Sequence, residues 1–105
     1  RNPVKAQRAV KNSGGKWIAV SDDEILEAMR LLGRSEGVFG EPAGVTATAG
    51  VVKAVANGLI RSNESVTVIS TGSGLKDVKN AMLAAGEPFK CEPDIKALEA
   101  SGRIR

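Results

Sequence analysis

The 105-residue chain has a net charge of +3, with 42% hydrophobic and 26% charged residues, which is ordinary for one globular domain. It contains no histidine and a single cysteine, Cys91, so a Ser-His-Asp triad, a histidine-ligated zinc site and an internal disulfide are excluded. No apolar run reaches membrane-spanning length and no aromatic platform accompanies the basic N-terminal stretch, so we expect a cytoplasmic protein that binds neither membranes nor nucleic acid.

The first part of the chain predicts two helices on either side of a short strand. Residues 4–12 have loosely helical spacing and are followed by a Ser-Gly-Gly stop. Residues 17–20, Trp-Ile-Ala-Val, are rich in strand formers and too short for a helix. Ser21 and Glu24 have the spacing of a capping box, which predicts a helix that continues to a stop at Gly37.

The centre of the chain predicts two more strands with a helix between them. Residues 38–40 form a short strand that leads into the turn Glu41-Pro42-Ala43-Gly44. Residues 45–56 are small and apolar on nearly all sides, which indicates a buried helix packed closely on a neighbour. Residues 66–70 are apolar without clean alternation, which is typical of a strand covered on both faces in a parallel sheet.

The C-terminal part predicts two further helices. Asp77 can cap a helix that runs through Leu83. Residues 88–91 form a connector or edge strand, and Pro93 suits the start of a last helix through Ala100. The alternation of strands and helices predicts an α/β fold, a small three-layer domain with a three- to four-stranded, mainly parallel sheet, formed by residues 1–105 as one domain.

Two loops with polar residues and glycine are the candidate functional site. Thr71-Gly72-Ser73-Gly74 follows the third strand, and its glycines let the backbone approach a ligand while two hydroxyls offer hydrogen bonds. It lacks the lysine of a P-loop and the third glycine of a dinucleotide fingerprint. The structural alternative is a tight turn with capping hydroxyls, and for Glu41 it is an acid at a helix N-terminus. Because both loops follow strands, we expect them at one carboxyl edge of the sheet.

Other reactive residues have simpler interpretations. Lys76 and Asp77 could form a catalytic pair, but an exposed pair near a helix start is favoured. Cys91 is disfavoured as a nucleophile because no histidine is present and a glutamate follows it. We expect Trp17 and Met29 to lie in the core rather than to contact a ligand.

Residues 41–53 (EPAGVTATAGVVK) and 64–77 (ESVTVISTGSGLKD) closely resemble the C-terminal third of the threonine synthases. These enzymes belong to the tryptophan-synthase-β-like group that uses pyridoxal phosphate (PLP). Residues 13–28 fit the same region, and the resemblance covers roughly residues 1–85. The Glu-Pro-Ala-Gly turn alone would also fit threonine dehydratase, whereas Thr-Gly-x-Gly-Leu-Lys-Asp points to threonine synthase.

The resemblance implies a role for each candidate residue. Thr71 matches the residue whose hydroxyl bonds the pyridine nitrogen of PLP, and a neutral partner of this kind leaves that nitrogen largely unprotonated. Gly72 and Gly74 match positions where the loop passes close to the ring, and Glu41 matches the turn near the cofactor. Ser73 stands where histidine or asparagine is more usual, so it departs from the family at the edge of the cofactor.

The resemblance also implies what these residues lack. The family's Schiff-base lysine and phosphate-binding glycine loop lie upstream of the matching region. We therefore expect a fragment of the tryptophan-synthase-β-like PLP fold, the C-terminal portion of its large PLP-binding domain. The parent enzyme would convert O-phosphohomoserine and water to threonine and phosphate with PLP. The chain alone is predicted to be inactive and not to bind PLP.

Two alternatives remain open at this point. One is a stand-alone α/β domain that binds a small ligand or a partner without catalysis. The other is a fragment of a PLP lyase like threonine dehydratase. In each case the exposed sheet edges and the nearly all-apolar helix 45–56 predict a homo-oligomer.

Overall fold

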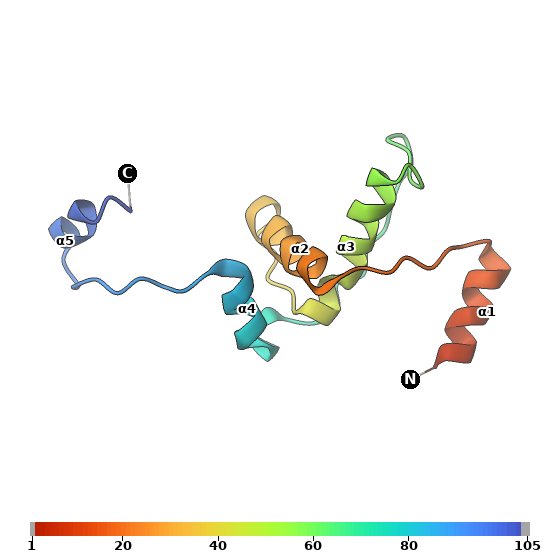
Figure 1. Ribbon diagram of the computed structural model, residues 1–105, viewed down its shortest axis with the longest axis horizontal. Helices are drawn as coiled ribbons and strands as arrows, with labels where there is room; N and C mark the ends of the chain where they lie inside the picture. The colour runs from red at the N-terminus through yellow and green to blue at the C-terminus, as the bar shows by residue number, and fades with distance from the viewer. Residues whose placement is uncertain (1, 104–105) are drawn as a thin grey trace.

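The computed structural model describes residues 2–103, which form an elongated, helical chain. Its radius of gyration is 18.1 Å, against about 13 Å for a compact domain of this length. Figure 1 shows the two terminal helices at opposite ends of the molecule, away from a central group of three helices. In chain order the elements are α1 (Pro3–Ser13), α2 (Asp22–Ser35), α3 (Pro42–Ala56), the 3₁₀ turn η1 (Gly74–Lys76), α4 (Val78–Ala85) and α5 (Ile95–Ala100).

The core lies where α2 packs against both α3 and α4, and we call these three helices the helical trio. Val45 of α3 is completely buried, and Met29 of α2 is 6% exposed beside it. Ala81 and Ala84 present small side chains from α4, so that helix can approach α2 closely. The core is small because it consists of a few short side chains with the apolar face of α2 around them.

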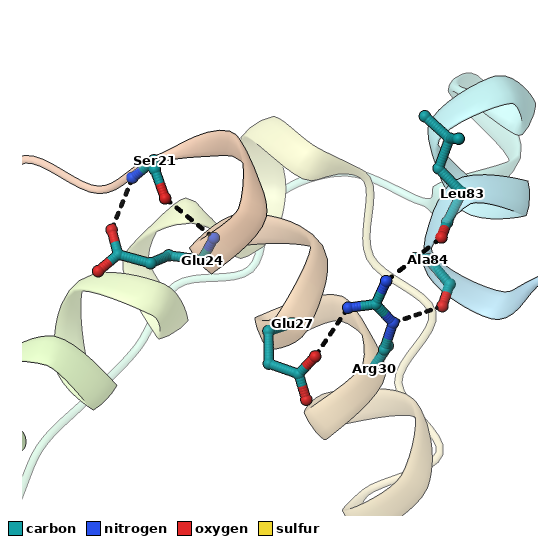
Figure 2. Close-up of polar contacts among 6 residues, drawn as sticks. All are labelled: Ser21, Glu24, Glu27, Arg30, Leu83 and Ala84. Carbon is teal, nitrogen blue, oxygen red and sulfur yellow. Dashed lines mark hydrogen bonds and ion pairs between the residues drawn. The ribbon is translucent and has the colours of Figure 1, made fainter.

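The start of α2 confirms the predicted capping box (Figure 2). The Ser21 hydroxyl accepts a hydrogen bond from the Glu24 backbone N–H at 3.2 Å, and the Glu24 carboxylate accepts one from the Ser21 N–H at 2.6 Å. These two bonds satisfy backbone donors that the first helical turn leaves free. At the other end Gly37 has φ of 66°, the left-handed conformation that favours glycine after a helix.

Arg30 ties α2 to the C-terminal end of α4 (Figure 2). Its Nε donates to the Ala84 carbonyl at 2.7 Å, and Nη2 donates to the Leu83 carbonyl at 3.3 Å. The last carbonyls of a helix have no partner within the helix and carry a partial negative charge, which suits a guanidinium. Glu27 pairs with the same guanidinium at 2.7 Å, so Arg30 is bonded on both sides.

The predicted sheet is wrong: residues 2–103 contain no strand. Of the segments expected to be strands, only 38–40 makes any ladder contact, an isolated antiparallel bridge between Gly40 and Ser73. Residues 65–70 are exposed throughout. A helix satisfies its backbone groups internally, whereas a strand needs the N–H and C=O groups of a neighbour. The apolar segments find no such neighbour among residues 2–103, so the predicted three-layer α/β fold is not formed.

The predicted helices are confirmed, with shifts at their ends. α3 begins at Pro42 rather than at Val45, because proline is favoured in the first helical turn. α5 begins at Ile95 because the Asp94 carboxylate, which accepts from the Ala97 N–H at 3.2 Å, caps it in preference to a start at Pro93. None of the helices in the described part of the chain has the length and apolarity needed to cross a bilayer.

Two expectations about burial fail along with the sheet. Met29 is in the core as predicted, but Trp17 is 68% exposed. α3 is not buried on all sides: Val45, Ala49 and Ala54 are buried, but Val52 is 48% and Val55 53% exposed. Both failures concern apolar surface that a sheet would have covered.

Candidate functional site

The two candidate loops lie against each other, as expected from their sequences. The backbone N–H of Glu41 donates to the Gly72 carbonyl at 2.9 Å, and the N–H of Gly74 donates to the Phe39 carbonyl at 3.0 Å. These bonds run antiparallel, so the loops meet through their own backbones and not along the edge of a parallel sheet. We call residues 39–44 and 71–76 the paired loops.

Three glycines allow the paired loops to approach so closely. A Cβ atom on Gly72 would overlap the Glu41 carboxylate, and one on Gly74 would overlap the Phe39 ring. A Cβ on Gly44 would lie 2.8 Å from the Gly72 nitrogen and 3.1 Å from its oxygen. The absence of a side chain is therefore required by contacts between the loops, in addition to any contact with a ligand.

The charged residues of the paired loops do not form the catalytic pair considered from the sequence. Lys76 faces Glu41, with 3.8 Å between the Lys76 Nζ and the Glu41 Oε1. The Glu41 side chain is only 20% exposed. Asp77 instead caps α4, accepting from the Asn80 side-chain amide at 2.7 Å and from the Asn80 backbone N–H at 3.2 Å. These two hydrogen bonds, led by the side-chain bond, lower the pKa of Asp77.

The two hydroxyls of the second loop differ in their surroundings. Ser73 accepts from the Leu75 N–H at 3.3 Å and so caps η1, which is the turn role considered from the sequence. Thr71 is exposed beside Gly72. Thr71 does not line the four cavities found between other residues of the described chain, and its side chain is exposed. The structure thus places Glu41, Gly72 and Ser73 together, with Thr71 accessible at their edge.

The family model of the pyridoxal-phosphate dependent enzymes matches residues 2–72. The chain belongs to this family. The matched range includes Glu41, Thr71 and Gly72, and it ends immediately before Ser73, the position that departs from the usual pattern.

Curated relatives with the name threonine synthase match most of the chain. That of Methanocaldococcus jannaschii is 45% identical over 101 residues, which is 93% of this chain and 25% of the relative. That of a Bacillus species is 49% identical over 72 residues, or 69% of this chain and 20% of the relative. That of Methanosarcina acetivorans is 39% identical over 97 residues, or 92% and 24%. The chain therefore spans about a quarter of the length of these relatives.

The paired loops fit one end of the family's cofactor. The Thr71 hydroxyl is exposed and can form a hydrogen bond with a ring nitrogen, and Gly72 leaves no side chain beside it. The space directly over Gly72 is filled by the Glu41 carboxylate. Of these two residues, Thr71 is the one that is open to a ligand.

Sequence reasoning missed two residues that shape this site. The Phe39 carbonyl accepts a hydrogen bond from Gly74, and the Phe39 ring packs against Gly74. Gly44, in the first turn of α3, allows this helix to pack directly against the Gly72 backbone. A signal existed for each. Phe39 is one of only three aromatic residues in the chain, and Gly44 is the glycine of the predicted turn directly before the helix 45–56.

Proposed function

We propose that this chain supplies the pyridine-nitrogen end of the PLP site of a threonine synthase. That enzyme would convert O-phosphohomoserine and water to threonine and phosphate. The observation that supports the proposal best is the exposed Thr71 on a glycine loop that is clasped by the Glu-Pro-Ala-Gly turn. Relatives named threonine synthase that match along 92–93% of the chain favour this assignment over a threonine dehydratase-like lyase.

In this proposal each residue of the paired loops has a defined task. PLP, when bound, supplies an electron sink that stabilises negative charge on the substrate carbon. Thr71 offers its neutral hydroxyl to the ring nitrogen, which keeps that nitrogen largely unprotonated. Gly72 leaves room for the Glu41 carboxylate, which packs over it beside Thr71. Glu41 holds Gly72 in place through its backbone N–H, while its carboxylate remains near the Lys76 ammonium.

The test removes the Thr71 hydroxyl from the full-length polypeptide that contains this sequence. Thr71→Val keeps the side-chain shape and removes one hydrogen bond, so we expect kcat for threonine formation from O-phosphohomoserine to fall about 10- to 100-fold, the range for a bond to a charged or developing-charge group. The matched control is Thr67→Val, the same substitution in the exposed segment 65–70, which should leave the rate unchanged. A Thr71→Val enzyme with the wild-type rate and cofactor spectrum would refute the role of Thr71.

For the 105 residues alone we expect no turnover of O-phosphohomoserine with added PLP. In this proposal the Thr71 hydroxyl orients the ring but cannot take up the proton that the reaction releases. Lys76, the lysine of the paired loops, faces Glu41 instead. Threonine formed by the purified 105-residue chain, assayed by phosphate release, would contradict this expectation.

The proposed setting follows from the reaction. The substrate is a small phosphorylated amino acid, and a free, exposed Cys91 is compatible with the reducing cytoplasm. We propose that residues 1–105 act as one domain and bind no nucleic acid. Exposed apolar residues such as Val66 and Ile69 support self-association, which sedimentation of the purified chain measures directly.

A further inference from the structure

A cavity of about 280 Å³ lies between α2 and α4, with Phe39 in its lining. We call it the α2–α4 cavity. Its apolar lining includes Met29, Ala81 and Ala84, which also belong to the core of the helical trio. Phe39, half exposed, and Arg34 line it as well, so an apolar surface and a cation lie together.

The two arginines that line the α2–α4 cavity differ in their partners. Arg30 lines it, but its guanidinium is paired with Glu27 at 2.7 Å and bonded to the carbonyls at the end of α4 (Figure 2). Arg34 lies one turn further along α2 and has no carboxylate within ion-pair distance among residues 2–103. Arg34 is thus an exposed cation at the rim of the cavity, and among the described residues its guanidinium is available to a ligand.

We propose that the α2–α4 cavity binds a small organic carboxylate with an apolar body. The planar guanidinium of Arg34 matches the two oxygens of a carboxylate, and such bonds are among the strongest that side chains form. Met29 and the two alanines would cover the apolar body, and the Phe39 ring would pack against it. The volume is just below the range of about 300–1,000 Å³ for drug-sized ligands, so the ligand is small.

Phe39 connects this cavity to the paired loops. Its ring lies against Gly74, and its carbonyl accepts the Gly74 N–H at 3.0 Å. A ligand that packs on the ring will therefore change the surroundings of the Gly74 amide, although it does not touch that residue. This gives a specific signal for occupancy of the cavity.

The experiment titrates 3-phenylpropionate into the ¹⁵N-labelled 105-residue chain and follows amide shifts by NMR. We expect saturable shifts in α2, α4 and Gly74 with a Kd of about 1 mM, reasonable for a ligand of this size. The uncharged 3-phenylpropanamide has the same shape, and we expect it to bind at least about tenfold more weakly because it cannot form the charged pair with Arg34.

Two pairs of variants distinguish binding in the α2–α4 cavity from nonspecific binding elsewhere on the chain. Gly33 lines the cavity and has nothing within 4 Å of an added Cβ, so Gly33→Leu should fill the space and abolish binding while the chain remains folded. Gly50→Leu, at an equally open helical position in α3 away from the cavity, should bind as wild type. Arg34→Gln should weaken binding about tenfold, whereas Arg8→Gln, the same change in charge on α1, should not.

Three results would overturn the proposal. They are the absence of saturable shifts in the folded chain, equal binding of the acid and the amide, and wild-type binding by Gly33→Leu. Because the probe contains no phosphate or pyridine and the readout requires no turnover, none of these results bears on the proposed PLP site. Conversely, an inactive or PLP-free enzyme would leave this binding unchanged.

Discussion

The helical trio and the two extended segments, residues 15–20 and 65–70, contain the same kinds of apolar residues and have opposite fates. In the trio, Val45 is fully buried and Met29 nearly so. In the segments, Trp17 and Ile69 are largely exposed. The difference arises from the backbone: each helix satisfies its own hydrogen bonds before it packs, and an extended segment depends on a partner to do so. Apolar content indicates what can be buried, and backbone pairing decides whether it is.

The largest expected effect tests this contrast directly. Met29→Ala removes a side chain that is 6% exposed in the centre of the trio, so it should lower the free energy of unfolding by roughly 2–5 kcal/mol. Ile69→Ala truncates a residue that is 73% exposed, so it should change that free energy by less than about 0.5 kcal/mol. Urea unfolding followed by circular dichroism measures both. Equal losses for the two variants would mean that residues 65–70 are buried in solution.

The second prediction concerns the contact between α3 and the candidate loop. Gly44→Ala places a Cβ 2.8 Å from the backbone nitrogen of Gly72, so one of the paired loops must shift, at a cost of about 1–3 kcal/mol. Gly50→Ala adds the same methyl group where nothing lies within 4 Å and should stabilise α3 by up to about 1 kcal/mol. Thermal unfolding should therefore show shifts of opposite sign. A stabilised Gly44→Ala variant would show that the loops are not in contact.

The contrast between helices and extended segments also explains how much of the fold the sequence predicts. The capping box of Ser21 and Glu24, the stop at Gly37 and the Asp77 cap are local features, and all were found. The sheet depended on long-range pairing that no short stretch of sequence encodes. Residues 66–70 have a strand-like composition, but composition does not say which backbone will accept their hydrogen bonds.

The contact between the two candidate loops was predicted, although the sheet around them was not. The proximity of Glu41 to Gly72 was expected from two similar loops at one sheet edge, and it occurs without that sheet because backbone bonds join the loops directly. What could not be predicted is the partner of each charge. Lys76 is next to Asp77 in sequence but faces Glu41, because Asp77 is engaged in capping α4.

The third prediction tests how α4 is held on the trio. Arg30→Met keeps much of the apolar stem and removes the bonds to the Ala84 and Leu83 carbonyls. Because the guanidinium is partly exposed, we expect a loss of about 1 kcal/mol, below the usual 1.5–3 kcal/mol for bonds to a charged group. Amide exchange in α4 should accelerate more than in α3. Arg34→Met, one turn away and without these bonds, is the control, and equal acceleration in both variants would contradict the role of Arg30.

The smallest effect is a dependence on pH at the junction of α2 and α3. The Lys53 ammonium, 2.9 Å from the Glu24 carboxylate, and then the Ser21 N–H lower the pKa of Glu24. A carboxyl whose pKa is lower in the folded state than its unfolded value of about 4.3 stabilises the fold above that pH. This stabilisation disappears as the pH falls through the folded pKa. Lys53→Met should therefore weaken the acid-induced loss of stability between about pH 5 and pH 2, whereas Lys96→Met on α5 should not. A steep acid transition that persisted in Lys53→Met would contradict this role of Glu24. It would assign the transition to other carboxylates, such as Asp77 at the start of α4, whose pKa is also lowered.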